Sequence, residues 1–350
     1  MAKAPDGATG YVPLPIRDDW LSLVSEPAID PGLSIVDAHH HLWARPGSRY
    51  MAEEYAAECT AGHLLSASVH VECGYGADLA GPLHLRPVGE TRFAERVRTE
   101  AHAGRYGDGH LCAALVARAD LTQGDATAAA LEAHATASAA LRGIRQFAAW
   151  HPDPRVVSGF TAAPRGLLSD PAFRAGFARL APAGLSFDAW IYHTQIEELA
   201  DLSRSYSETA IVLNHFGGPV GTGPFSGRLG ESFADWRRCL ATLRDLPNVR
   251  VKLGGLGMRL GGFDLFARDR PPGSDELARL WAPIVETAIE TVGPARAMFE
   301  SNFPVDKGSV GWTVLWNTFK KITASFSADE RARLFAGTAT EVYRLWAEAS

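Results

Sequence analysis

Eight short apolar runs recur along the chain, and they constrain its fold more than any other feature. Each is rich in Val, Ile, Leu or Phe and is bounded by Gly, Pro or Asp, as buried strands are. The runs cover residues 34–42, 65–73, 110–118, 141–147, 184–192, 209–217, 248–256 and 296–304. Segments 125–140, 194–206 and 231–246, which lie between some of these runs, have a helical pattern. This alternation over 350 residues predicts an α/β fold, a (β/α)8 TIM barrel. A doubly wound open sheet is the alternative, but the Gly-rich phosphate loop that it would need is not present.

The ends and loops of the chain complete the predicted organisation. Residues 1–30 are rich in Pro, Asp and small residues, which predicts an irregular N-terminal arm around the domain or a neighbour, or else a frayed tail. Residues 31–350 are expected to form a single barrel domain. Gly- and Pro-rich segments 217–231 and 256–275 predict enlarged loops after the sixth and seventh strands. Loops in these positions build the active site of a barrel.

Composition excludes several classes of protein. A net charge of −6 argues against a nucleic-acid-binding surface. No run of about 18 apolar residues is present, so we expect no membrane span, and residues 1–20 lack the apolar core of a signal peptide. Cys59, Cys73, Cys112 and Cys239 are widely spaced and form no C-x-x-C pair, which favours reduced thiols. These features predict a cytoplasmic protein that acts on a small molecule, either alone or as a homo-oligomer.

The densest polar cluster is SIVDAHHHLW, residues 34–43. Asp37, His39 and His41 alternate with other residues, so a regular strand would point all three to one face. His39 and His41 would then project together at the end of the first strand, where two imidazoles can bind one divalent cation. A hydrogen-bonded pair of core histidines is the alternative. Metal binding is favoured, because neighbouring buried imidazoles need a reason to tolerate desolvation.

Within this cluster, VDAHHHLW resembles the first-strand motif of the amidohydrolase superfamily. The resemblance is to the amidohydrolase-related branch, which includes sugar lactonases, a pyrone-dicarboxylate lactonase and non-oxidative decarboxylases. Four later segments resemble, in the same order, that branch's motifs in strands four, six, seven and eight: LRGIRQF, IVLNHFGGP, VRVKLGGL and FESNFPVD. The resemblance covers residues 34–346. It implies a TIM barrel with a divalent metal, Zn or Mn.

The resemblance also implies roles for four histidines. His39 and His41 match the positions of metal ligands. His215, at the end of the sixth strand, matches a position that either binds metal or orients the substrate. His193, at the end of the fifth strand, is a further candidate ligand, or a surface residue that opens the next helix.

Several other residues are candidates for substrate binding. Arg145 on the fourth strand suits bidentate binding of a carboxylate, or else forms a structural ion pair. Lys252 on the seventh strand either reaches the site or extends outward past the helices. Trp43 and Tyr192 follow strand ends and are expected to line the pocket, although aromatic residues also pack barrel rims. Glu72 follows the second strand and would enter the mouth of the barrel.

The chain departs from the family pattern at Asn302, where the eighth-strand motif has Asp. An amide takes no proton at neutral pH and is an uncharged, poorer metal ligand. We consider Asn302 a neutral ligand or substrate contact. The missing base would be replaced by Glu300, Asp306 or Glu72, or by a histidine.

These residues lead us to expect a hydrolase that opens a lactone or ester of a small carboxylated or sugar-derived compound. Water would be activated by the metal or by a carboxylate base. Hydrolysis of a C–N bond is compatible with the same residues. The main alternative is a decarboxylase of an aromatic or enol acid, which needs no strong base for water. A barrel that binds ligand without catalysis is a minor alternative.

Overall fold

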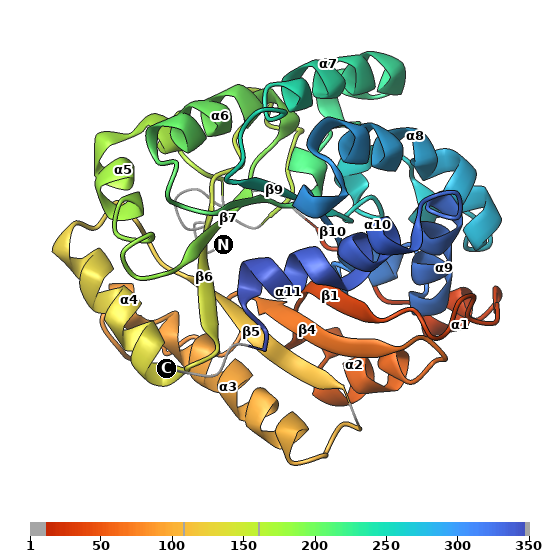
Figure 1. The fold of residues 1–350 in the computed structure, drawn as a ribbon, viewed down its shortest axis with the longest axis horizontal. Helices are drawn as coiled ribbons and strands as arrows, with labels where there is room; N and C mark the ends of the chain where they lie inside the picture. The colour runs from red at the N-terminus through yellow and green to blue at the C-terminus, as the bar shows by residue number, and fades with distance from the viewer. Residues whose placement is uncertain (1–11, 108, 160–161, 347–350) are drawn as a thin grey trace, which may run out of the picture.

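Eight parallel strands form a nearly closed barrel at the centre of the computed structural model, which describes residues 12–107, 109–159 and 162–346 (Figure 1). In order they are β1 (Ile35–His40), β4 (Leu65–Val71), β5 (His110–Arg118), β6 (Leu141–Phe147), β7 (Ser186–Trp190), β8 (Ile211–Leu213), β9 (Val249–Leu253) and β10 (Ala297–Phe299). The barrel closes between β1 and the residues that follow Phe299, the last residue of β10. There the N–H of His41 donates to the carbonyl of Phe303 (2.7 Å), and the N–H of Asn302 donates to that of His39 (2.9 Å). The predicted (β/α)8 barrel is confirmed.

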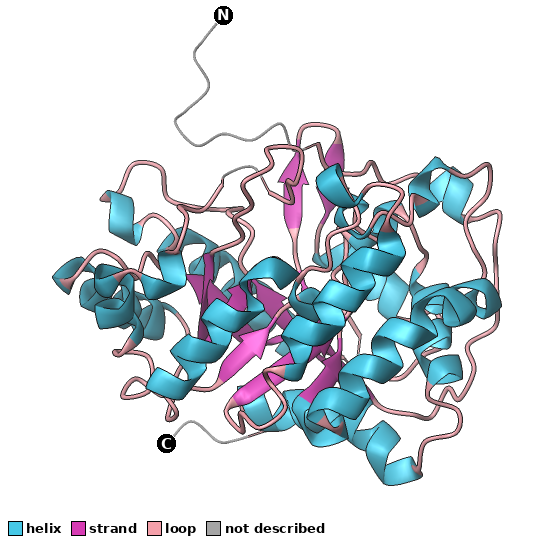
Figure 2. Ribbon diagram, turned by 90° about the horizontal axis from the view of Figure 1, so that it is seen from above, coloured by secondary structure: helices cyan, strands magenta, loops and turns pink. Residues whose placement is uncertain are grey.

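Helices surround this barrel in both views (Figures 1 and 2). The helices are α1 (Asp18–Leu21), α2 (Ala52–Cys59), α3 (Val88–His102), α4 (Asp125–Ala137), α5 (Pro171–Phe177), α6 (Ile196–Ser205), α7 (Leu229–Ala241), α8 (Ser274–Val292), α9 (Trp312–Ile322), α10 (Ala328–Ala332) and α11 (Thr338–Tyr343). The helices predicted at 125–140, 194–206 and 231–246 correspond to α4, α6 and α7. The predicted ends extend too far, because the backbone at Ser138 is extended and a looser turn follows Ala241.

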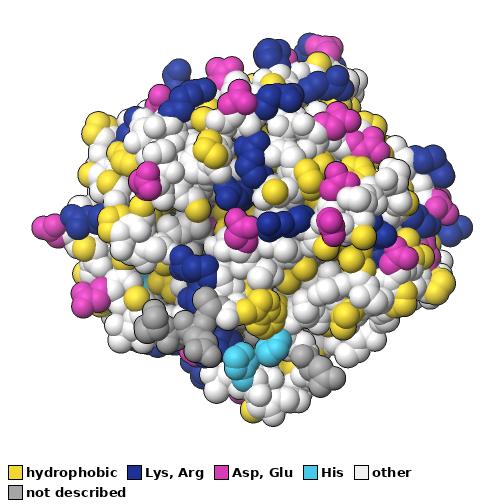
Figure 3. Space-filling view, viewed as in Figure 1, with side chains coloured by type: hydrophobic (Ala, Val, Ile, Leu, Met, Phe, Trp, Pro, Cys, Tyr) yellow, Lys and Arg dark blue, Asp and Glu magenta, His cyan; other side chains and the backbone are white. Residues whose placement is uncertain are grey.

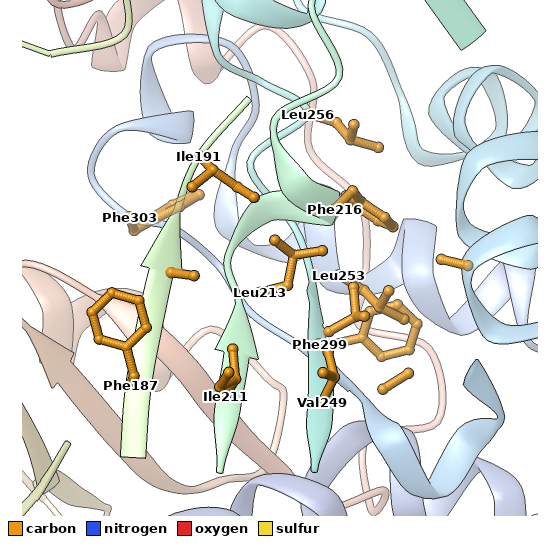
Figure 4. Packing of buried hydrophobic residues seen from close by; sticks show 14 of the residues in the cluster. Phe187, Ile191, Ile211, Leu213, Phe216, Val249, Leu253, Leu256, Phe299 and Phe303 are labelled. Atoms are coloured by element: carbon orange, nitrogen blue, oxygen red, sulfur yellow. The ribbon is translucent and has the colours of Figure 1, made fainter. Parts of the chain in front are cut away.

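Alternate strand residues pack outward against the helices or inward into the barrel. The outward layer includes Phe187, Ile211, Leu213, Val249, Leu253 and Phe299, all fully buried (Figure 4). The inward layer consists of smaller residues such as Val36, Val69, Val116 and Val212, and Tyr343 of α11 packs among them. This inner layer fills the barrel where the strands begin. Polar side chains at the other end of the strands therefore have a packed floor beneath them.

The two enlarged loops and the arm lie where the site was expected. Residues 214–228 connect β8 to α7, and residues 254–273 connect β9 to α8. The described part of the arm lies against this same chain: Trp20 Nε1 donates to the carbonyl of Arg268 (3.0 Å), and the N–H of Ile29 donates to Asn317 Oδ1 (2.9 Å). Residues 1–11 of the predicted arm lie outside the described residues. A short hairpin, β2 (Trp43–Arg45) and β3 (Ser48–Tyr50), follows β1.

The surface charges and the helix lengths relate to two expectations from the sequence, that the protein binds no nucleic acid and that it has no membrane span. On the face in Figure 3, acidic and basic side chains are interspersed. The absence of a nucleic-acid partner stays a prediction. No helix within the described ranges is both long and apolar enough to cross a membrane.

Candidate active site at the mouth of the barrel

A bulge in β1 determines which way its polar residues point. Asp37 pairs with Ser68 of β4, and His40 pairs with His70, so β1 advances three residues while β4 advances two. The expectation that Asp37 shares a face with His39 and His41 is therefore wrong, because the extra residue reverses the alternation. Asp37 instead accepts hydrogen bonds from the Tyr55 hydroxyl (2.7 Å) and the Ser301 hydroxyl (2.6 Å).

His39 and His41 do converge, as predicted. Their Nε2 atoms lie 3.2 Å apart, and both rings are buried. Nδ1 of His41 lies 2.7 Å from the carbonyl of Val71, which must accept, so Nδ1 carries the proton and Nε2 presents its lone pair. Burial, followed by nearby cations such as Lys252 for His39 and Arg145 for His41, holds the pKa of both imidazoles well below the usual range. The rings are therefore neutral.

Glu300 connects His39 to His215. Nδ1 of His215 lies 2.6 Å from Oε1 of Glu300, and Nδ1 of His39 lies 3.0 Å from Oε2 without forming an aligned hydrogen bond. Glu300 is fully buried, directly after β10. A carboxylate on Nδ1 fixes the tautomer of His215, because that nitrogen must donate its proton and Nε2 is left as the acceptor.

Arg145 is already held in place. Its Nε donates to Glu72 Oε1 (2.7 Å), another nitrogen donates to the carbonyl of Glu72, and Nη1 lies 3.3 Å from Nε2 of His39. The structure thus contains the ion pair that was one alternative for Arg145. Glu72 and Arg145 both line the pocket, but binding of a substrate carboxylate by Arg145 would have to replace some of these contacts.

Lys252 lies beneath the site rather than on its surface. Its ammonium binds Asp188 Oδ2 (2.7 Å) and approaches Nδ1 of His39 (3.4 Å), with no exposed area. The alternative in which Lys252 extends outward past the helices is therefore wrong. Asp188 also accepts hydrogen bonds from Asn214 and from the Tyr343 hydroxyl, so its charge is fully compensated.

Asn302 is fixed by Asp306. Nδ2 of Asn302 donates to Asp306 Oδ1 (2.8 Å), and the N–H of Gly257 donates to Oδ2 (3.0 Å). Burial, with a smaller contribution from Glu300, raises the pKa of Asp306 to about 7. Because the amide nitrogen faces Asp306 and Asn302 lines the pocket, Oδ1 is the amide atom available to a ligand. Asp306 itself does not line the pocket.

These groups meet a cavity of about 230 Å3 at the mouth of the barrel. Its polar or aromatic lining residues are Trp43, Arg45, Ser48, Glu72, Arg118, Arg145, Phe147, Ser158, Trp190, His41, His215, Arg259 and Asn302. Pro13, Leu14 and Ile16 of the arm complete the wall. Tyr192 contributes only indirectly, through its hydroxyl, which lies 2.9 Å from that of Ser158.

His193 is not part of this group. Its Nδ1 accepts a hydrogen bond from the N–H of Val220 (3.1 Å), and its ring packs against Phe225. The chain turns into a short helix after β7 and carries this ring toward the β8–α7 loop. Among the described residues, the two clusters suited to a metal ion are His39–His215–Glu300 and His40–His70–Cys112. The structure thus does not support His193 as a ligand beside His39.

The residues around His39 fit a divalent metal ion. The Nε2 atoms of His39 and His41 lie 3.2 Å apart, which is within hydrogen-bond distance. Nitrogens that share one ion at about 2.1 Å are separated by roughly the same distance. Oε2 of the buried Glu300 has no hydrogen bond, so negative charge is available beside His39. Against this, Nη1 of Arg145 points to the same nitrogen and would have to move aside.

Sequence reasoning missed Asp188 as a partner of the site. It is the one acidic residue in the apolar segment 184–192, and it pairs in register with Arg145 of β6. A lone carboxylate in a buried strand needs a cation nearby, so its position predicts such a cation, although it does not identify Lys252 as the partner.

Comparison with known proteins identifies the family of the chain. The family model described as Amidohydrolase matches residues 36–345. The chain is 33% identical to an uncharacterized protein of Sinorhizobium fredii, over 89% of this chain and 99% of that one. It is 26% identical to an L-fucono-1,5-lactonase of Burkholderia multivorans, over 89% and 96%. A crystal structure of a Burkholderia multivorans amidohydrolase with bound zinc superposes with a TM-score of 0.68, at 23% identity, over 89% and 99% of the two chains. With the family model matching most of its length, the chain belongs to the amidohydrolase family.

Proposed function

We propose that this protein is a metal-dependent hydrolase that opens a lactone or ester bond of a small carboxylated or sugar-derived compound. The observation that carries the proposal is the convergence of the His39–His41 pair and the His215–Glu300 pair at one pocket. The lactonase relative supports the class of bond, and the pocket supports a small substrate.

His39 and His41 would hold the metal, Zn or Mn, through Nε2. Bound there, the ion would supply Lewis-acid polarisation and a more acidic water. The Val71 carbonyl behind His41 and Glu300 behind His39 would keep both rings oriented toward it.

His215 would act as the general base in place of the missing carboxylate. Its Nδ1 is bound to Glu300 (2.6 Å), so Nε2 is free to take a proton from the attacking water. Glu300 would then stabilise the imidazolium that forms, as the buried aspartate does in a catalytic triad. Glu300 is in this proposal a positioning residue, since it touches His215 rather than the pocket.

Asn302 would accept a hydrogen bond through Oδ1. Its amide cannot rotate without losing the bond to Asp306, so the acceptor points in one direction. A substrate hydroxyl or the attacking water, each of which donates, would be oriented by it.

The charge of the pocket favours an acidic substrate. Arg45, Arg118, Arg145 and Arg259 line it, and Glu72 is the one acidic residue among the described lining residues. Because Glu72 is paired with Arg145, the guanidinium groups of Arg118 and Arg259 give the pocket a positive potential in a chain of net charge −6. A carboxylate on the substrate would be attracted there.

The test is to assay a panel of aldonolactones and carboxylated lactones and to follow proton release at constant pH. The protein is purified without a histidine affinity tag. We expect faster turnover of lactones that carry a carboxylate, and a loss of turnover in His215→Asn. A decarboxylase is the second candidate, because position 302 lacks the carboxylate that would activate water. Release of CO2 from aromatic or enol acids, with no lactone hydrolysed, would replace the first proposal by the second.

A further inference from the structure

A second group of metal-binding residue types lies on the other face of β1. His40, between the two site histidines in the chain, points away from them toward His70 of β4 and Cys112 of β5. The relative exposure of His40, His70 and Cys112 is 0%, 2% and 0%. One ligand atom from each of the three lies within 4.8 Å of the others.

Two irregularities in the strands bring these residues together. The bulge in β1 separates His40 from the inward-pointing pair. In β5, four residues pass from His110 to Ala114 while β4 advances two, and Cys112 within that stretch has a φ of +54°. A non-glycine residue in this region is uncommon, and here the turn directs Sγ of Cys112 to 4.0 Å from Nε2 of His40.

The polar atoms of this group are poorly satisfied. Nδ1 of His40 and both ring nitrogens of His70 are buried without a hydrogen-bond partner. Nε2 of His40 has the Ser68 hydroxyl at 3.0 Å. Glu90 Oε1 lies 3.5 Å from Nε2 of His70 and already accepts from the N–H of Cys73 (2.7 Å). Buried polar atoms without partners are rare in folded proteins and need an explanation.

A buried water explains only part of this. A cavity of about 10 Å3, close to the smallest that holds one water, touches His70 and Glu90. Neither His40 nor Cys112 lines it. A water there would give His70 a hydrogen-bond partner. It would still leave Nδ1 of His40 without a partner and would not contact the thiol of Cys112.

We propose that His40, His70 and Cys112 bind a Zn2+ ion, separate from the metal of the catalytic pocket. Imidazole nitrogens and a cysteine thiolate are both zinc ligands, and a water would complete four ligands around the ion. Ligands of a tetrahedral zinc lie roughly 3.5 Å apart, so the present spacing of 4.0 Å to at most 4.8 Å has to close by about 0.5–1.3 Å.

The role of this site would be structural. It lies outside the pocket lining and joins three neighbouring strands, β1, β4 and β5. An ion there would fix β1 immediately behind His39 and His41. It needs no substrate access, and its closed, buried position is that of a structural zinc site.

Cobalt substitution tests the proposal, because a cysteine ligand gives Co2+ a near-ultraviolet charge-transfer band that histidine and carboxylate ligands do not. The full-length protein is stripped by a chelator and titrated with Co2+, and the zinc content of untreated protein is measured by elemental analysis. We expect the band in the wild type and its loss in Cys112→Ser, together with the loss of one equivalent of zinc. His70→Asn is expected to lose the same equivalent.

Two controls separate this site from others. Cys239→Ser, on α7, removes a buried thiol elsewhere and is expected to keep the band and the zinc. His41→Ala removes a ligand of the proposed catalytic metal and should keep the band as well. If Cys112→Ser does not fold, the wild-type spectrum decides by itself. Co2+-loaded wild type without a thiolate band, or zinc unchanged in a folded Cys112→Ser, overturns the proposal.

Discussion

The two faces of β1 carry histidines one residue apart in surroundings of opposite kind. On the inner face, His39 and His41 lie among Arg145, Lys252 and Glu300, beside an open pocket. On the outer face, His40 is enclosed by Ser68 and Tyr55, and the carboxylate of Glu90 lies 3.5 Å from its neighbour His70. An open pocket can support chemistry with a substrate, whereas a closed group of ligands suits an ion that never leaves. The spacing of histidines in the sequence therefore does not by itself define a site. The residues that contact each ring, and whether a substrate can reach it, decide its role.

The largest effect is expected when the two histidines of the inner face are removed. We expect the double substitution His39→Ala/His41→Ala to remove the catalytic metal and lower kcat/KM by on the order of 10³-fold, because it removes the Nε2 pair. Elemental analysis and steady-state kinetics measure both. Cys112→Ser is the matched change on the outer face and should keep the catalytic metal. Equal metal content and turnover in the double variant and the wild type would refute the role of the pair.

A smaller effect is expected from Glu300→Gln, which preserves shape but removes charge. The amide cannot orient both His215 and His39 as the carboxylate does, and loss of such a partner costs roughly 10- to 100-fold in activity. The decrease should be in kcat rather than KM, since Glu300 does not line the pocket. Glu95→Gln provides a control at a paired carboxylate that does not line the pocket and should keep kcat. A change in KM alone would show that Glu300 does not position the base.

Much of this architecture was predictable, and the failures share a physical cause. The eight strands were found because a buried parallel sheet demands continuous apolar runs, and the ends of those runs located His39, His41, Arg145, His215 and Asn302. The orientation of Asp37 was not predictable, since a bulge adds a residue without a sequence signal of its own. The partner of a buried charge is equally hidden: Lys252 is near His39, yet its salt bridge is with Asp188, 64 residues away. Long-range pairing depends on register, which single-strand patterns do not report.

Position 302 is where the inner face of the barrel lacks the negative charge that the family pattern predicts. We expect Asn302→Asp to lower the free energy of unfolding by roughly 1–3 kcal/mol at pH 8, since it loses the hydrogen bond to Asp306 and places two buried carboxyl groups together. The loss should shrink at pH 5.5, where one of the two is protonated. Denaturant unfolding at both pH values measures this.

The swap Asn302→Asp/Asp306→Asn is the matched control for that prediction. It exchanges donor and acceptor, so the hydrogen bond can re-form with the carboxylate moved to position 302. We expect it to regain most of the lost stability. If it remains as unstable as the single variant, the pair does not act through this hydrogen bond.

The last effect concerns stability alone and involves His63, a buried histidine that belongs to neither cluster and serves as their baseline. Burial, with the Lys320 ammonium 3.0 Å from its Nδ1, lowers its pKa from 6.5 to about 4. Because the unfolded chain binds this proton more readily, the folded state loses stability as the pH falls from about 6.5 to 4. We expect His63→Gln to reduce that loss, by on the order of 2 kcal/mol between pH 7 and pH 4.5. Denaturant unfolding of both proteins over this range measures it, and parallel curves would contradict it. His63 belongs to neither proposed metal site, so a chelator should leave the stability difference between the wild type and His63→Gln unchanged. Any acid sensitivity that arises from the two metal-binding clusters should change when the chelator is added.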